Sequence, residues 1–96
     1  MTAYFVVDID VSDPEKFAVY REGVGAFVAK HGGEYLARGG EAEVFEGDFE
    51  PHRLIIFRFP SRDAIRAFMA DPDYQPLKRL RFEASTTRAF AVDGIA

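Results

Sequence analysis

The order of apolar segments along the chain predicts an α+β domain of the ferredoxin-like type: a β-α-β-β-α-β antiparallel sheet with two helical regions on one face. The chain has 96 residues, a length that supports one hydrophobic core but not two. Its composition is 48% hydrophobic and includes 10 Phe and 4 Tyr, which is ample for a packed interior. We therefore expect residues 1–96 to form a single domain.

The first strand and the first helix are expected to follow one another directly. Residues 3–11 (AYFVVDIDV) are rich in β-branched and aromatic side chains, which is typical of a strand. Ser12 is a suitable N-cap, and Glu15 stands three residues later to close a capping box. Apolar residues then recur at spacings of three and four, which predicts a helix over 14–31. We expect the side chain of His31 to interact with the last carbonyls of that helix.

Two strand-like segments come next. Residues 34–38 and 41–46 are predicted to form a second strand, bent or interrupted by a bulge at Gly39-Gly40. Residues 52–59 (HRLIIFRF) are strongly apolar and predict a third strand.

Two short helical pieces and a last strand complete the pattern. Ser61 can cap a helix that Pro72 stops, and Asp73 can cap a second piece that reaches Ala84. Residues 87–92 alternate as a last strand should. This order places the first and third strands at the centre of the sheet.

Both faces of the two central strands are apolar. In the first strand, Phe5, Val7 and Ile9 lie on one face, and the other, more polar face begins apolar, with Tyr4 and Val6 before Asp8 and Asp10. The third strand has the same two-sided pattern. Because the helices of this fold cover only one face, we expect a second copy of the chain to cover the other, which predicts a homodimer.

Composition argues against several classes of partner. With 12 basic and 16 acidic residues the formal charge is −4, which does not favour binding to nucleic acid. There is no cysteine, and His31 and His52 lack the spacing of a zinc pair, so we expect no metal or covalent cofactor. No apolar run approaches the roughly 18 to 20 residues that span a bilayer. Met1 leads straight into the first strand without a signal peptide, so a cytoplasmic location is expected.

The chain resembles the domain of unknown function 1330 family, in the dimeric α/β-barrel group. The resemblance covers nearly the whole chain and is carried by residues 4–10, 13–15, 32–40, 46–48, 53–60 and 71–74. It implies the ferredoxin-like fold and a dimer whose two sheets face each other. Related barrels include cofactor-free monooxygenases, isomerases and haem enzymes, but no motif of their catalytic residues has a match in this sequence.

A candidate ligand site combines two arginines with nearby polar groups. Arg38 precedes a glycine pair that permits close approach to the backbone, and a guanidinium presents a fixed fork of donors to a carboxylate. Arg53 opens the most apolar strand. With His52 and Tyr35, these arginines are predicted to form a pocket for a small acidic or aromatic metabolite in a cleft beside the sheet.

Asp8 is a further candidate, because a carboxylate among apolar neighbours must be desolvated, paired or aimed into a wet cavity. The alternative is that Asp8 and Glu46 neutralise Arg38 and Arg53 in a structural network.

Other polar groups are open to two interpretations. The hydroxyls of Tyr20, Tyr35 and Tyr74 could orient a ligand at the end of an apolar slot, or the rings could simply pack in the core or an interface. We interpret the basic run that includes Lys78 and Arg81 as a solvated face. Three functions remain open: a small-molecule binding protein, a cofactor-free enzyme, and an interaction module without chemistry.

Overall fold

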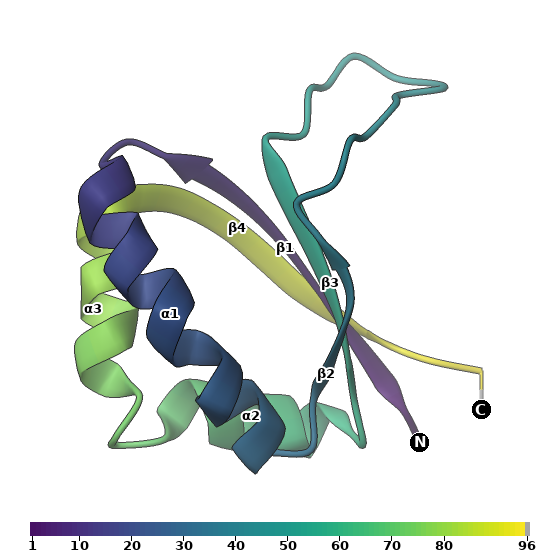
Figure 1. Ribbon diagram of the computed structural model, residues 1–96. Coiled ribbons are helices and arrows are strands. Elements are labelled where there is room, and N and C mark those ends of the chain that lie inside the picture. Colours follow the sequence, from purple (N-terminus) through teal and green to yellow (C-terminus); the bar gives the residue numbers. More distant parts are fainter. Residues whose placement is uncertain (96) are drawn as a thin grey trace.

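The computed structural model describes residues 1–95, and its elements follow the predicted order. The second helical region is divided into two helices that point in different directions (Figure 1). Among the described residues, no helix is long and apolar enough to cross a membrane. The elements are β1 (Ala3–Val11), α1 (Pro14–Lys30), β2 (Glu34–Arg38), β3 (Arg53–Phe59), α2 (Arg62–Ala70), α3 (Gln75–Ala84) and β4 (Ser85–Asp93).

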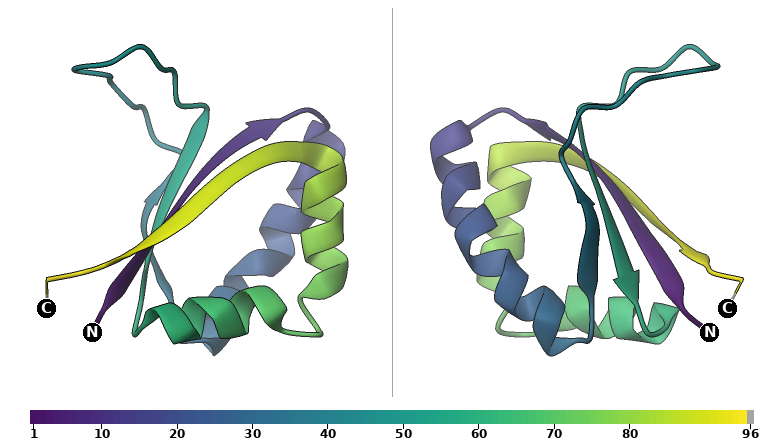
Figure 2. Two further views of the ribbon diagram at one scale, coloured as in Figure 1. Left: turned by 180° about the vertical axis from the view of Figure 1, so that it is seen from behind. Right: turned by 45° about the vertical axis from the view of Figure 1, so that its right-hand side comes forward.

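The strands form an antiparallel sheet in the order β2-β3-β1-β4, so β1 and β3 are central as predicted. In this register Val6 of β1 lies between Ile56 of β3 and Phe90 of β4. β4 begins at Ser85, two residues earlier than predicted, because pairing with β1 continues as far as Val11. All the helices cover one face of the sheet, and the other face is bare (Figure 1, Figure 2).

The hydrophobic core fills the space between the helices and the inner face of the sheet. Phe5, Val7 and Ile9 are buried on this face, which confirms the alternation expected for β1. The partners that pack with them are Ile55, Phe57 and Phe59 from β3, Phe17, Tyr20, Val24 and Val28 from α1, and Ile65, Phe68 and Tyr74 from α2 and the turn after it.

The outer face of the sheet is also apolar, as the two-sided pattern predicts. Tyr4, Val6 and Ile56 are only partly buried there, and Phe90 and Val92 of β4 are 62% and 51% exposed. Within residues 1–95 no helix shields these side chains, so a single copy of the described chain leaves an apolar strip open to solvent.

The prediction of strand structure over residues 41–46 is wrong. β2 ends at Arg38, where Gly39 turns the chain in the left-handed region (φ +69°) and donates its N–H to the carbonyl of Leu54 at 2.7 Å. β3 begins at Arg53, one residue later than predicted, so it offers no further length with which residues 41–46 could pair. The expected irregularity lies inside β2 as a register shift, and the segment after β2 projects away from the helices (Figure 2).

The N-terminal cap of α1 differs from the prediction. Asp13, not Ser12, accepts the hydrogen bond from the N–H of Lys16, at 3.2 Å. Ser12 is engaged elsewhere, because its hydroxyl donates to the carbonyl of Ala84 at 3.1 Å. The start of α1 is thereby attached to the end of α3.

The turn between α2 and α3 requires two further corrections. Asp73 does not cap α3, which begins after Tyr74 without a side-chain cap. The carboxylate of Asp71 organises the turn, since it accepts from the N–H of Asp73 at 2.9 Å and lies 2.8 Å from both Lys30 Nζ and His31 Nε2. The His31 ring therefore contacts Asp71 rather than the carbonyls of its own helix, which the backbone N–H of His31 contacts instead.

Candidate functional site

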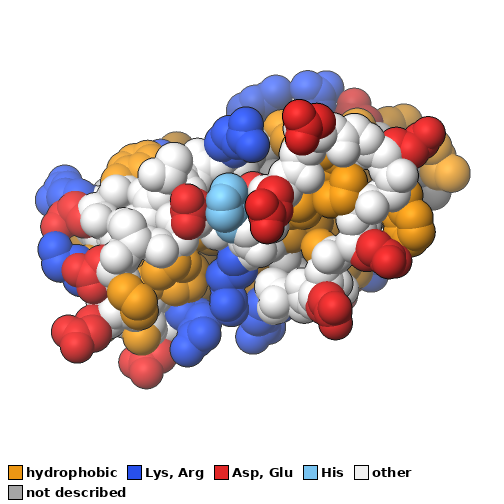
Figure 3. Space-filling view, turned by 90° about the horizontal axis from the view of Figure 1, so that it is seen from above, with side chains coloured by type: hydrophobic (Ala, Val, Ile, Leu, Met, Phe, Trp, Pro, Cys, Tyr) orange, Lys and Arg blue, Asp and Glu red, His pale blue; other side chains and the backbone are white. Residues whose placement is uncertain are grey.

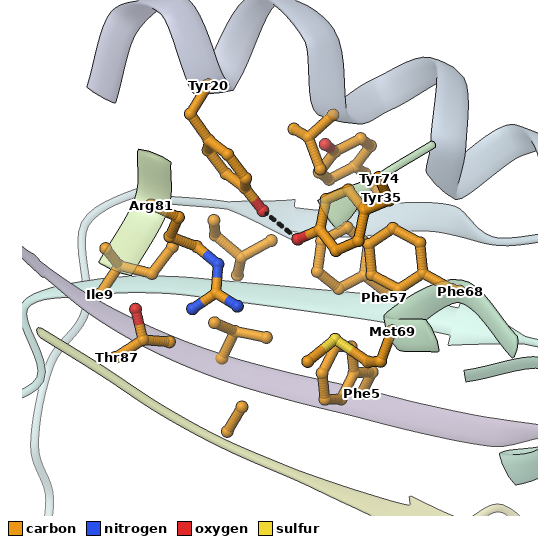
Figure 4. A pocket seen from close by; sticks show the side chains of 14 residues that line it. Phe5, Ile9, Tyr20, Tyr35, Phe57, Phe68, Met69, Tyr74, Arg81 and Thr87 are labelled. Atoms are coloured by element: carbon orange, nitrogen blue, oxygen red, sulfur yellow. Dashed lines mark hydrogen bonds between the residues drawn. The ribbon is translucent and has the colours of Figure 1, made fainter. Parts of the chain in front are cut away.

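A cavity of about 40 Å³ lies between the inner face of the sheet and the helices. Every helix and strand contributes to its lining, and Figure 4 shows the side chains that converge on it. One water molecule needs roughly 10–15 Å³ of such space, so the cavity can hold a small group of atoms. Much of its wall is aromatic, made by Phe5, Tyr20, Tyr35, Phe57, Phe68 and Tyr74.

Arg81 is the charged residue of this lining. It is only 6% exposed, and its guanidinium extends from α3 into the cavity (Figure 4). Among residues 1–95 no carboxylate forms an ion pair with it; the contacts of its guanidinium are with the rings of Phe82 and Tyr20, at 5.0 and 5.9 Å from their centroids. A buried cation without a counter-ion is costly, which makes this end of the cavity attractive to an anion.

A pair of tyrosine hydroxyls forms a second polar feature of the cavity. Tyr20 of α1 and Tyr74 lie with their hydroxyl oxygens 2.8 Å apart, in a buried hydrogen bond (Figure 4). Burial, reinforced by the neighbouring Tyr74, raises the pKa of Tyr20 well above its ordinary range, so Tyr20 stays protonated. Since one hydroxyl donates to the other, the pair retains one proton with which it can donate to a bound molecule.

At the β4 edge of the sheet, part of the cavity lining is exposed. Ala89 pairs with Val7, which is buried on the inner face, yet Ala89 itself is exposed although it lines the cavity. Its neighbour on that face, Thr87, is partly buried. Solvent therefore reaches the inner face beside small side chains at this edge.

Two of the residues predicted from sequence lie together at the opposite edge. Tyr35 of β2 lines the cavity, and its ring lies 4.7 Å from that of Phe57. The guanidinium of Arg38 lies 3.7 Å above the Tyr35 ring, on the more exposed side. Burial raises the pKa of Tyr35, and Arg38 opposes that shift.

Arg53 lies on the inner face at the start of β3. Its guanidinium is 5.7 Å from the centroid of the Phe17 ring, and its Nε is buried without a hydrogen-bond partner within residues 1–95. A Cβ placed on Gly39 would come within 3.0 Å of the Arg53 side chain. The space beside Gly39 is thus filled by Arg53 and is not open for a ligand to approach the backbone.

Asp8 and His52 form a separate pair outside the cavity. Asp8 accepts from the backbone N–H of His52 at 2.8 Å, and its other oxygen is 3.4 Å from His52 Nδ1. Asp8 lines a groove of about 410 Å³ on the outer face of the sheet, together with Leu54, Phe90 and part of the segment between β2 and β3. The predicted site residues are therefore distributed over both faces of the sheet, and only Tyr35 of the set lines the cavity.

Sequence reasoning missed Arg81, which it assigned to a solvated basic run. Arg79 is exposed as expected, but Arg81 follows Leu77 by four residues and Tyr74 by seven, on the buried side of α3. This helical spacing was the signal that could have placed its side chain inside.

The fold and the cavity define a small ferredoxin-like domain in which a buried arginine, Arg81, faces a cavity with aromatic walls. The chain belongs to the family described as Domain of unknown function (DUF1330), which matches residues 2–95 and confirms the resemblance seen in the sequence. No curated protein matches the chain. Within residues 1–95, no group of three or more His, Cys, Asp or Glu side chains is placed to hold a metal ion.

Solved structures share the fold over nearly the whole chain. Methylated RPA0582 from Rhodopseudomonas palustris has a TM-score of 0.79 at 17% identity, covering 99% of this chain and 82% of that one. SnoaB, a cofactor-independent oxygenase from Streptomyces nogalater, has a TM-score of 0.66 at 17% identity, covering 99% and 94%. A dimeric ferredoxin-like protein of unknown function from Jannaschia sp. CCS1 has a TM-score of 0.65 at 12% identity, covering 98% and 100%. Identities this low establish likeness of fold alone.

Proposed function

We propose that this protein binds a small organic anion in the cavity between its sheet and its helices. The observation that carries this proposal is the guanidinium of Arg81, which is buried, faces the cavity and has no carboxylate partner among residues 1–95. A ligand carboxylate would supply the missing counter-charge in two parallel hydrogen bonds, and the aromatic walls would contact the apolar part of the ligand. The ligand would enter at the β4 edge, beside Ala89.

Binding is favoured over catalysis by the chemistry of the lining. Among the described residues that line the cavity, none is Asp, Glu, His, Lys or Cys, and the raised pKa of Tyr20 keeps that hydroxyl from acting as a base near neutral pH. A cofactor-free enzyme is the alternative, and the observation in its favour is the fold shared with an oxygenase.

We also propose that the protein is a homodimer whose sheets face each other through their outer faces. Support comes from the apolar strip on that face, which includes Val6, Ile56 and the exposed Phe90. The similar protein from Jannaschia sp. is dimeric. The segment between β2 and β3 would lie at the border of this interface, since it overhangs the outer-face groove and carries the exposed Phe45 and Phe49. In the view from above, hydrophobic side chains are exposed there among acidic ones (Figure 3).

The anion-binding proposal is tested by calorimetric titration of the wild type and of Arg81→Met with propionate, benzoate and their uncharged amides. The wild type is expected to bind at least one carboxylate and neither amide, and Arg81→Met is expected to lose this binding. Arg79→Met is the matched control, because it removes an exposed charge two positions away on the same helix. Carboxylate binding that survives in Arg81→Met, or no binding by the wild type, would contradict the proposal.

A further inference from the structure

We infer that the ligand is a short oxo acid, a carboxylate that carries a second acceptor oxygen close by. This inference rests on the proposed function, since it assumes that Arg81 binds the carboxylate. It adds a second contact, in which the hydroxyl pair of Tyr20 and Tyr74 donates to the ligand's oxo group.

The cavity presents more hydrogen-bond donors than a ligand with only a carboxylate group can use. The Arg81 guanidinium presents a fork that a carboxylate fills in bidentate fashion. The hydrogen bond between Tyr20 and Tyr74 consumes one of the two hydroxyl protons, and within residues 1–95 the remaining proton has no acceptor. A buried donor without a partner is unfavourable, so a ligand that supplies an acceptor at this point gains affinity over one that does not.

The two donor groups line the same cavity. The guanidinium carbon of Arg81 lies 5.9 Å from the centroid of the Tyr20 ring, and both side chains point into this cavity (Figure 4). The inferred ligand would direct an oxo group, separated from the carboxylate by one or two bonds, toward the tyrosine pair while its carboxylate contacts Arg81.

The size and shape of the cavity favour a short, flat molecule. Its volume of about 40 Å³ corresponds to roughly three water molecules, which suits an acid of few atoms. The walls consist largely of aromatic rings: those of Phe68 and Tyr74 stack with centroids 4.5 Å apart, and that of Tyr35 lies 4.7 Å from Phe57. A planar oxo carboxylate packs against such faces better than a branched acid does.

The test compares acids that differ only in the oxo group: pyruvate with propionate, and acetoacetate with butyrate. Each pair is titrated calorimetrically into the wild type, into the double variant Tyr20→Phe/Tyr74→Phe, and into Tyr4→Phe, which removes a hydroxyl on the outer face of the sheet. Removing both hydroxyls together leaves no unpaired hydroxyl behind.

In the wild type and in Tyr4→Phe, the oxo acids are expected to bind about 2- to 12-fold more tightly than their partners. In the double variant this ratio should fall to about one, while binding of propionate persists. As a readout that needs no substitution, pyruvate should perturb the tyrosine ultraviolet spectrum of the wild type and propionate should not.

The possible failures are distinguishable. If all four acids bind equally well to the wild type, the oxo-acid inference is overturned and the proposed function stands. A preference that persists in the double variant, or a tyrosine spectrum that pyruvate leaves unchanged, also overturns the inference. If neither these four acids nor benzoate binds, both the inference and the proposed function fail, whereas binding of benzoate alone overturns only the inference.

Discussion

Gly23 and Gly25, two residues apart on α1, have different surroundings. A Cβ on Gly23 would lie 2.8 Å from Leu77 Cδ1 of α3, whereas a Cβ on Gly25 would meet nothing within 4 Å. Replacing glycine by alanine inside a helix adds about 1 kcal/mol to the free energy of unfolding when there is room for the Cβ. We therefore expect Gly25→Ala to raise the free energy of unfolding by about that amount, and Gly23→Ala to gain less or to lose stability because Leu77 must move. Urea unfolding of the two variants tests this order, and equal gains would contradict the close packing of α1 on α3.

Arg81 should cost the unliganded protein stability. Each of its contacts with Phe82 and Tyr20 stabilises the fold by about 0.5–2 kcal/mol. Burying an unpaired cation costs several kcal/mol, and this cost is smaller where water reaches the cavity. We expect Arg81→Met to raise the free energy of unfolding by roughly 1 kcal/mol, a shift of about 4–8 °C in melting temperature for a domain of this size. A large loss of stability in Arg81→Met would mean that the arginine serves the fold and not a ligand.

At this scale the sequence was informative about which residues are polar and near the core, but not about what each one touches. Tyr20, Tyr35 and Tyr74 could be named as groups near an apolar slot, and they line the cavity. Arg81 was assigned to solvent because its neighbours in sequence are basic, although helical spacing placed it beside Leu77 on the inner side of α3. Charged residues are exposed on average, but at binding sites a charged residue can be buried, so its charge alone does not predict its position.

Between elements, Asp71 joins the end of α1 to the turn between α2 and α3. Hydrogen bonds from Lys30, from His31 and from the backbone N–H of Asp73 lower the pKa of Asp71 below its usual range. A carboxyl with a lowered pKa stabilises the fold fully above its unfolded pKa of about 3.9, and this stabilisation is lost as pH falls below that value. The packing of α1 against the turn between α2 and α3 is therefore expected to weaken as pH falls below about 4, where Asp71 loses its stabilising effect.

We expect Asp71→Asn to lower the melting temperature by several degrees at pH 7, and the gap from the wild type to narrow as pH falls below about 4. Asp73→Asn is the matched control, since its side chain is 80% exposed and lies 3.9 Å from Lys30, and it should have little effect. Melting curves between pH 7 and pH 3 provide the measurement, and a gap that stays constant over this range would contradict the assigned role of Asp71.

Helices and strands were predictable where the spacing of apolar residues and the turn residues indicated the same element. They were not predictable where the structure depends on pairing with a residue or strand far away in the chain. Residues 41–46 have strand-like alternation, but β3 is too short to pair with them. The contact of His31 with Asp71 joins residues 40 apart in the chain, and no local pattern reports it. Strand pairing and buried ion pairs are tertiary properties, so a single sequence indicates candidates without choosing among them.

For the whole molecule, the element order and the two apolar faces of the central strands were visible in the sequence, and both are found in the fold. We expect a homodimer because the outer face of the sheet is apolar and exposed. Phe90 of β4 and Phe82 of α3 are both 62% exposed, but only Phe90 lies on the outer face of the sheet.

We expect the wild type to sediment with twice the monomer mass of 10.8 kDa at low micromolar concentration, and Phe90→Glu to sediment as a monomer. A charge in the centre of an apolar interface remains desolvated without a partner, so it should dissociate the two copies. Phe82→Glu, which changes an equally exposed ring, should remain dimeric. A monomeric wild type, or a dimer that Phe82→Glu alone disrupts, would contradict a dimer built through the outer faces of the sheets.

Binding of an anion by Arg81 in the cavity between the sheet and the helices is tested most directly by locating a bromine-labelled carboxylate in crystals. Crystals soaked in 3-bromopropionate can be measured at the bromine absorption edge, so that the anomalous signal reveals the position of the ligand. We expect a peak between the sheet and the helices, near Phe5 and Tyr20, with the carboxylate facing Arg81, and no such peak in Arg81→Met crystals. A peak confined to the outer-face groove beside Asp8 and Phe90, or a peak that remains in the cavity when Arg81 is replaced, would contradict this expectation.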